Sequence, residues 1–126
     1  MYQLIIIDDE EKILEGISEL FPWNQIGFEV AGTFTQASAA LDYMEDHPID
    51  VVMTDIQMPD MDGLEATRRI RAMDREDAAE IPIIALTANA FDEDVQRSMQ
   101  AGLNAHLSKP VEPADLYDTL EKLIRP

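Results

Sequence analysis

Four consecutive carboxylates follow directly on an apolar run near the start of the chain. Residues 4–7 read Leu-Ile-Ile-Ile, and Asp8, Asp9, Glu10 and Glu11 come next. One interpretation is the start of a helix, because acidic side chains suit the positive end of a helix dipole and Asp8 with Glu11 resembles a capping box. The other is a cation site, because clustered carboxylate oxygens favour a small divalent cation. The two interpretations are compatible, and the rest of the chain must be used to weigh them.

Three more side chains that could take part in a reaction each follow an apolar run of strand length. Asp55 comes after residues 51–54, Thr87 after 83–86, and Lys109 shortly after 105–107. If these runs are parallel strands, their carboxyl ends meet at one edge of a sheet, where ligands of such sheets bind. We therefore expect these three side chains to converge with Asp8 and Asp9.

Such a cluster has a definite chemistry. Aspartates from two strands provide the oxygen ligands that Mg²⁺ prefers, and Lys109 provides a point charge for a carboxylate or a phosphoryl group. An aspartate held beside a cation and a lysine can attack phosphorus and form an aspartyl phosphate. Thr87 offers a hydroxyl to an incoming oxygen. The cation and the lysine would stabilise charge on the transferring group.

The hydrophobic pattern predicts the elements that position these residues. Strand-like runs occur at residues 3–7, 28–31, 51–54, 83–86 and 105–107, and helical spacing occurs at 13–21, 37–44, 64–73, 95–99 and 116–124. Three of the strand-like runs are continuous rather than alternating, which is typical of strands buried on both faces. The alternation of strand and helix, five times over, predicts an α/β fold with an open parallel sheet and helices on both faces.

Composition narrows the function classes. The chain has 126 residues, no cysteine, and a formal charge of −17 from 26 acidic and nine basic residues. It is sized for one domain, disulfides and thiolate metal sites are excluded, and direct nucleic acid binding is unfavourable. No stretch is long and apolar enough to span a bilayer, and no signal peptide is visible, so a cytoplasmic location is the expectation. The nearest basic cluster, Arg68, Arg69 and Arg71, is expected on a solvated helix face, and Trp23 is expected to plug the loop beneath the first helix.

Four motifs together resemble the response-regulator receiver domains of two-component signalling, the CheY-like family. They are IIIDDEE, VVMTDIQMPDMDG, IIALTA and HLSKPV, in the family's order and spacing. The resemblance covers the whole chain, so we expect residues 1–126 to form one receiver domain without an output domain. It implies a flavodoxin-like (βα)5 fold with strand order 2-1-3-4-5.

The resemblance also implies roles for individual residues. Asp55 would be the phosphoacceptor, and Thr87 and Lys109 would contact the phosphoryl oxygens. A Mg²⁺ ion would be held by Asp9 directly, by Asp8 largely through water, by Asp55, and by the backbone carbonyl of Gln57. The bond between Lys109 and Pro110 would be cis.

The family's signalling mode supplies further expectations. The phosphoryl donor would be a phosphohistidine on a sensor histidine kinase or a histidine phosphotransfer domain. Phosphorylation would draw Thr87 inward and shift the face made by the fourth helix, the fifth strand and the fifth helix. His106 stands at the position of the switch residue, where Tyr or Phe is commoner in the family. The resemblance implies a monomer or a weak, phosphorylation-dependent dimer that contacts neither nucleic acid nor membrane. It also implies that the domain catalyses only its own phosphorylation and slow dephosphorylation and is otherwise no enzyme.

Two rival functions stay open at this stage. A Mg²⁺-dependent phosphatase of the haloacid-dehalogenase type also forms an aspartyl phosphate, but it usually carries a second Asp where this chain has Gln57. A pseudo-receiver would be an interaction module without phosphorylation. The first half of the chain resembles receivers of transcription regulators and the second half those of hybrid kinases. A free-standing protein, an excised domain and a recombination of two receivers therefore all remain possible.

Overall fold

The computed structural model describes residues 1–20, 22–55, 61, 63–74, 80–87, 102–109 and 111–124. Its strands are β1 (Tyr2–Ile7), β2 (Phe28–Phe34), β3 (Val51–Asp55), β4 (Ile83–Thr87) and β5 (Ala105–Ser108). Its helices are α1 (Glu11–Leu20), α2 (Ala37–Asp46), α3 (Gly63–Arg71) and α5 (Pro113–Ile124), with a 3-10 turn, η1, at Trp23–Ile26. The five predicted strands are confirmed, as are four of the five helices. The fourth predicted helix, at 95–99, lies outside the described residues.

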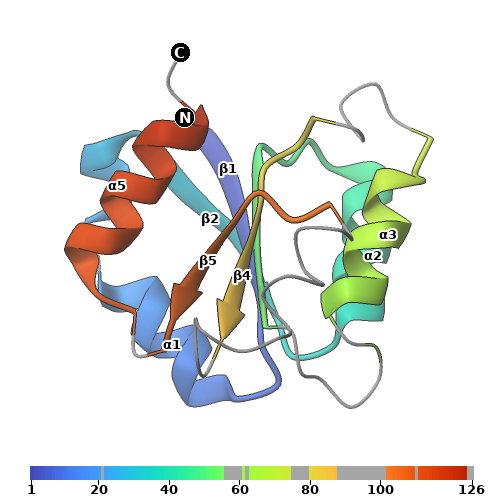
Figure 1. The fold of residues 1–126 in the computed structure, drawn as a ribbon, viewed down its shortest axis with the longest axis horizontal. Coiled ribbons are helices and arrows are strands. Elements are labelled where there is room, and N and C mark those ends of the chain that lie inside the picture. The colour runs from blue at the N-terminus through green and yellow to red at the C-terminus, as the bar shows by residue number, and fades with distance from the viewer. Residues whose placement is uncertain are drawn as a thin grey trace.

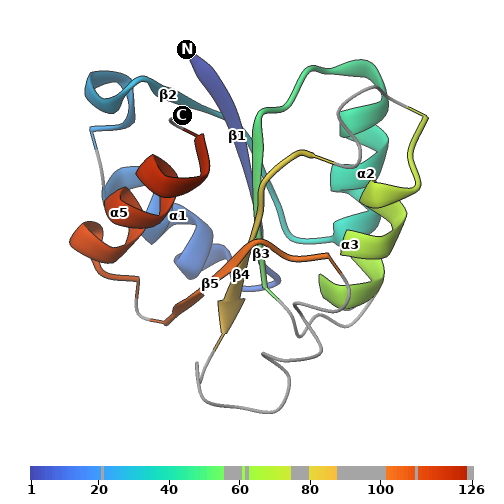
Figure 2. The ribbon, with the colours of Figure 1, turned by 45° about the horizontal axis from the view of Figure 1, so that its top comes forward.

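The five strands form one parallel sheet in the order β2-β1-β3-β4-β5. Helices α1 and α5 cover one face of this sheet, and α2 and α3 cover the other (Figure 1). The turned view shows the same three layers, with the sheet between the two pairs of helices (Figure 2). The predicted fold class and strand order are both confirmed.

Each face of the sheet has its own hydrophobic core, and β1 supplies both. Ile5 and Ile7 pack on the α2 and α3 side, whereas Leu4 and Ile6 pack on the α1 and α5 side. All four are fully buried. Because successive side chains of a strand point to opposite faces, a strand covered on both sides must be apolar at every position. The continuous apolar run before Asp8 is explained by this central place in the sheet.

The edge strand β2 is longer than the sequence predicted. The predicted strand ended at residue 31, but the observed one continues to Phe34 and contains an irregularity, because Leu4 pairs with Val30 and Ile5 pairs with Gly32. One residue is therefore extra on the β2 side, as in a β-bulge. An edge strand is only partly buried, so its apolar pattern is weak beyond the bulge.

Trp23 occupies the predicted position beneath α1. Its ring is buried, and its Nε1–H donates to the carbonyl oxygens of Ile17 and Ser18 at 3.2 and 3.1 Å. These two carbonyls belong to the last turn of α1, which lacks intrahelical donors. Trp23 thus both packs against the helix and satisfies its end.

The prediction for Arg71 was wrong. Arg68 and Arg69 lie on the surface and pair with Glu65, as expected. The guanidinium of Arg71 instead donates from Nη1 to the carbonyl of Ile81 at 2.6 Å, and from Nη2 to Gly102 O at 2.7 Å and Asn104 Oδ1 at 2.8 Å. Desolvation by burial lowers the pKa of Arg71. Arg71 therefore joins the end of α3 to the segments that begin β4 and β5.

Among the described residues, every helix falls short of the length and apolar character that a membrane span requires.

Candidate functional site

The carboxyl ends of the central strands bring three carboxylates together. Asp8 and Asp9 follow β1 directly, and Asp55 is the last residue of β3. One carboxylate oxygen from each of the three lies within 4.8 Å of the others. In the sheet, β1 lies between β2 and β3. The connection from β1 leads to β2 on one side, and the connection from β2 returns to β3 on the other side, so the strand order reverses at β1. In open α/β sheets that point is the usual place for a ligand.

Asp8 is held firmly in a buried position. Its side chain is fully buried, its backbone N–H donates to the carbonyl of Phe34 at 2.9 Å, and its Oδ1 accepts from the backbone N–H of Glu10, also at 2.9 Å. The capping box expected between Asp8 and Glu11 is therefore replaced by a tighter turn that spans two residues. Glu11 lies in the first turn of α1, as predicted, and Glu10 precedes the helix.

Lys109 connects two of the carboxylates. Its Nζ lies 2.7 Å from Asp8 Oδ2 and 3.3 Å from Asp55 Oδ2. Its position is fixed by β5, because the backbone N–H of Lys109 donates to the carbonyl of Thr87 at 2.8 Å. Asp55 is 8% exposed and the Lys109 side chain is 19% exposed, so both ion pairs are shielded from solvent. Buried charges are stable only when paired in this way.

The environment of Lys109 acts on its pKa in two directions. Desolvation by burial lowers the pKa, but hydrogen bonding and charge attraction from Asp8 and Asp55 raise it more. The net effect is a pKa above the ordinary value for lysine. Lys109 is consequently a permanent positive charge at neutral pH.

The three carboxylates exceed the charge of the one lysine, so the cluster fits a further cation. Asp8 and Asp55 are buried and Asp9 is exposed, which leaves the cluster open on the side of Asp9. One oxygen from each of the three carboxylates lies within 4.8 Å of the others, so Asp8, Asp9 and Asp55 would together be able to hold one small divalent cation. The donor set contains only oxygen, which suits Mg²⁺.

Thr87 and His106 lie on the adjoining strands β4 and β5. Thr87 pairs in register with Ser108, and His106 pairs with Ala85. Within the part of the chain that the structure describes, the Oγ1 of Thr87 and the Nε2 of His106 are buried and accept or donate no hydrogen bond. A buried hydroxyl usually has a hydrogen-bond partner, but among the described residues the Thr87 hydroxyl has none and keeps its donor free beside the strand ends.

Some predicted features lie outside the described residues. They are the backbone carbonyl of Gln57 and the bond from Lys109 to Pro110. The structure does bring together Asp8, Asp55 and Lys109 as ion pairs and adds Asp9 to the carboxylate cluster. Thr87 and His106 are located on the strands where they were predicted.

The doubly wound parallel sheet and the acidic cluster at its carboxyl edge are typical of flavodoxin-like α/β domains. Residues 4–121 match the family described as "Response regulator receiver domain", so the chain belongs to that family. Receiver domains are the phosphoacceptor domains of two-component systems. The resemblance seen in the four sequence motifs is thereby confirmed.

Relatives from several organisms show where such domains occur. The chain is 31% identical to the polar-differentiation response regulator DivK of Brucella ovis, covering 96% of this chain and 94% of that protein. It is 34% identical to a probable histidine kinase 2 of Oryza sativa and 30% identical to the heme response regulator HssR of Staphylococcus epidermidis. The match with the rice kinase covers 86% of this chain but only 11% of the kinase. The match with HssR covers 99% of this chain and 52% of HssR. Both response regulators and kinases with much longer chains therefore contain a segment of this kind.

Solved structures agree with the fold and include a metal-bound example. The receiver domain of the sensor histidine kinase PA1611 from Pseudomonas aeruginosa superposes with a TM-score of 0.83 at 31% identity, covering 99% of this chain and 98% of that one. That structure has a magnesium ion coordinated in its active site cleft. The chemotaxis protein CheY4 of Vibrio cholerae superposes with a TM-score of 0.86 at 27% identity, covering 98% and 99%.

Proposed function

We propose that this domain is a phosphoacceptor switch in which Asp55 receives a phosphoryl group from a phosphohistidine, with Mg²⁺ as cofactor. The observation that supports this most directly is the position of Lys109 Nζ, 2.7 Å from Asp8 and 3.3 Å from Asp55 at the carboxyl edge of the sheet. A lysine so placed is next to the nucleophile and can meet the oxygens of an incoming phosphoryl group. A merely structural ion pair would not require a third carboxylate, Asp9, at the open side.

Each residue has a role in the proposed transfer. A carboxylate oxygen of Asp55 attacks phosphorus, the new O–P bond forms as the N–P bond to the donor histidine breaks, and the electron pair stays on the imidazole, which takes up a proton. Lys109 attracts the negative oxygens of the transferring group, and Thr87 donates its unused hydroxyl hydrogen to one of them. Asp8, Asp9, Asp55 and the backbone carbonyl of Gln57 would hold Mg²⁺. When bound, the ion neutralises charge and orients the phosphoryl oxygens.

The proposed output depends on β4 and β5. If Thr87 turns toward the phosphoryl group, it leaves space next to β5, where His106 is half-buried. His106 can then change its rotamer and alter the face formed by the fourth helix, β5 and α5. An imidazole fills less volume than the more usual aromatic ring, so we expect a smaller movement.

The proposed partner is a sensor histidine kinase or a histidine phosphotransfer domain in the cytoplasm. Two observations support this choice: the relatives include histidine kinases, and one similar structure is the receiver of a sensor histidine kinase. The strong negative charge of the chain disfavours direct nucleic acid contact.

Beryllofluoride, which mimics a phosphoryl group, tests the proposal. Backbone NMR spectra are recorded with Mg²⁺ alone, with beryllofluoride alone and with both. We expect Mg²⁺ alone to shift Asp8 and its neighbours, because these residues would hold the ion. Shifts at Thr87 and His106 should appear only with both, and Asp55→Asn should lack this second set of shifts. The control is Asp42→Asn, the same change at an exposed position of α2. Unchanged spectra in the native protein, or equal changes in Asp55→Asn, would contradict the proposal.

The two rival functions make different predictions in simple assays. A phosphatase releases many phosphate molecules per protein from a phosphate ester, whereas a phosphoacceptor switch incorporates at most one. A pseudo-receiver responds to neither Mg²⁺ nor phosphodonors. Its Trp23 fluorescence and its thermal stability therefore stay constant when either is added.

A further inference from the structure

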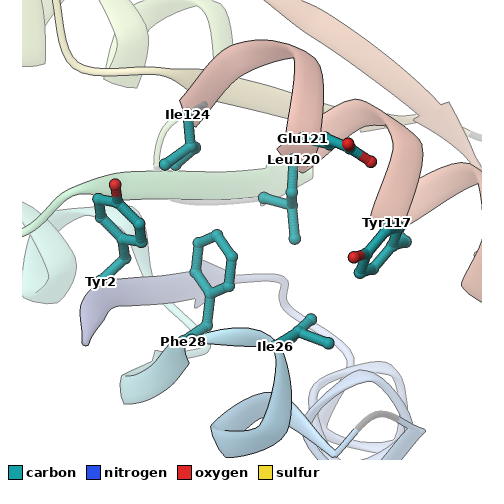
Figure 3. A pocket seen from close by; sticks show the side chains of 8 residues that line it. Tyr2, Ile26, Phe28, Tyr117, Leu120, Glu121 and Ile124 are labelled. Atoms are coloured by element: carbon teal, nitrogen blue, oxygen red, sulfur yellow. The ribbon is translucent and has the colours of Figure 1, made fainter. Parts of the chain in front are cut away.

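A small apolar pocket lies at the opposite edge of the sheet from Asp55. It has a volume of about 120 Å³ and is lined from the start of β1, from η1 and β2, and from α5. Leu120 and Phe28 are buried on its inner side, and Ile26 and Ile124 flank them (Figure 3). Because Tyr2 and Phe28 begin their strands, this edge contains the amino ends of the strands, and the phosphoacceptor site contains the carboxyl ends.

The surface around this pocket is unusually apolar for the molecule. In the ranges that the structure describes, the large hydrophobic side chains classed as exposed are Met1, Tyr2 and Tyr117. Tyr2 and Tyr117 both line the pocket, and Met1 is next to Tyr2 in the chain. Figure 3 shows the two tyrosine rings on opposite sides of the opening. Exposed apolar side chains that gather at one concave place indicate an interaction site.

The volume favours a side chain of a protein over a free metabolite. Pockets for small molecules usually measure about 300–1,000 Å³, whereas a cavity of about 150 Å³ holds a single benzene ring. A pocket of about 120 Å³ that opens to the surface therefore accommodates part of one leucine, methionine or phenylalanine side chain, with the remainder at the opening. Buried anchors of this kind, surrounded by aromatic residues, provide most of the affinity in many protein interfaces.

The charge around the pocket indicates the flanking residues of the partner. Glu121 lines the pocket on the same side as Tyr117 (Figure 3) and forms no ion pair in the described part of the chain, whereas the neighbouring Lys122 is already paired with Asp118 at 3.0 Å. The whole chain has a formal charge of −17. A segment with Lys or Arg next to its apolar anchor is thus attracted, and an acidic segment is repelled.

We propose that this pocket docks a basic protein segment that inserts one apolar side chain, flanked by Lys or Arg, between α5 and the start of β2. The site is separate from the phosphoacceptor edge, and its occupancy does not require phosphorylation. Phe28 also lies edge-on to Trp23, with ring centroids 6.3 Å apart, so a side chain bound against Phe28 alters the surroundings of the indole.

Short capped peptides test this proposal with the whole chain. The probes are Lys-Phe-Lys, Lys-Ala-Lys and Glu-Phe-Glu, each titrated while backbone NMR shifts and Trp23 fluorescence are recorded. Burial of a phenylalanine side chain is worth about 1.5–3 kcal/mol, so we expect Lys-Phe-Lys to bind at least about tenfold more tightly than Lys-Ala-Lys. The shifts should concentrate at Tyr2, Gly27, Phe28 and Tyr117, and the acidic peptide should bind more weakly than the basic one.

A pair of matched variants separates a specific site from general charge attraction. Glu121→Gln should weaken Lys-Phe-Lys binding about threefold, whereas Glu15→Gln, an equal charge change on α1, should leave it unchanged. Tyr117→Ala, at an exposed position, should also weaken it, and urea unfolding verifies that the variants fold. Equal effects of the two Gln variants, equal binding of the Phe and Ala peptides, or no localised shifts at millimolar peptide would overturn the proposal. Shifts that depend on protein concentration without peptide would assign the pocket to a second copy of this chain and overturn it as well.

Discussion

At the scale of single residues, the arrangement of Asp8 explains why an apolar strand leads into a charged cluster. Asp8 is fully buried, and its charge is compensated by Lys109 and by the backbone N–H of Glu10. Glu11 begins the helix instead. The four carboxylates that look alike in the sequence therefore divide into two in the cluster and two at the entrance to α1.

Replacing Lys109 by Met should lower the free energy of unfolding by about 2–3 kcal/mol in the absence of Mg²⁺. The substitution leaves the buried carboxylate of Asp8 without its counter-charge, and breaking a fully buried pair costs about 3–5 kcal/mol. The expected loss is smaller because the Lys109 side chain keeps 19% exposure. Urea unfolding in EDTA measures the effect.

The matched control is Lys122→Met, which removes an exposed pair with Asp118 on α5. Such surface pairs contribute about 0.5 kcal/mol or less. Equal losses in the two variants would mean that Lys109 does not compensate a buried charge. In the double variant with Asp8→Asn, most of the Lys109→Met loss should disappear.

Replacing glycine by alanine should change the stability in opposite directions at two positions. Gly27 ends η1 with φ of 89°, a conformation that L-residues avoid, whereas Gly16 is inside α1 and an added methyl group would meet nothing within 4 Å. Gly27→Ala should therefore cost about 1 kcal/mol, and Gly16→Ala should add about 0.5–1 kcal/mol. Thermal unfolding of both variants measures this, and changes of the same sign would contradict the helical and left-handed assignments.

At the scale of elements, Arg71 at the end of α3 holds the segments that precede β4 and β5 in place. Its three hydrogen bonds join α3 to Ile81, Gly102 and Asn104, and Asn104 Oδ1 also accepts from the backbone N–H of Ile83 at 2.8 Å. The relative positions of β4 and β5, and hence of Thr87 and Lys109 at their other ends, depend on this junction.

Arg71→Met should reduce the free energy of unfolding by about 2 kcal/mol, because two part-buried carbonyls lose a charged donor. Arg71→Lys should not restore it, since a lysine lacks the planar fork that reaches three acceptors. Arg68→Met, at an exposed position of the same helix, is the control and should change stability by less than about 0.5 kcal/mol. Urea unfolding together with amide exchange near Asn104 distinguishes these outcomes.

The elements were largely predictable because their hydrophobic patterns are strong. A strand buried on both faces, such as β1, has a continuous apolar run, and the amphipathic helices repeat at helical spacing. The extension of β2 was missed because an edge strand alternates poorly and a bulge changes its register. The role of Arg71 was missed because two of its three acceptors are backbone carbonyls, which have no signature in the sequence, and the third, Asn104, is remote from it in the chain.

The candidate site was predictable for a different reason. Asp55 and Thr87 end their strands, and Asp8, Asp9 and Lys109 follow theirs. A parallel sheet gathers these strand ends at one edge. The distances within the cluster, the turn between Asp8 and Glu10, and the pocket next to Tyr2 could not be predicted. These depend on side-chain packing between elements that are remote in the chain.

At the scale of the whole molecule, negative charge dominates. With a formal charge of −17, the compact state is opposed by repulsion among its carboxylates, and salt screens this repulsion. In EDTA, an increase of NaCl from about 0.05 to 0.5 M should therefore raise the melting temperature. Calorimetry measures the rise, which should be smaller in a charge-reduced variant, Glu15→Gln with Glu19→Gln. A constant or falling melting temperature would contradict this view.

The central claim is that Asp55 accepts a phosphoryl group at the carboxyl edge of the sheet. The most direct measurement is the intact mass of the protein after treatment with acetyl phosphate and Mg²⁺, compared for the native chain, Asp55→Asn and the exposed control Asp42→Asn. We predict the added mass of one phosphoryl group in the native chain and in Asp42→Asn, its loss on treatment with hydroxylamine, and no addition when EDTA replaces Mg²⁺ or when Asp55 is changed to Asn. An unmodified native chain, or equal modification of Asp55→Asn, would contradict the account.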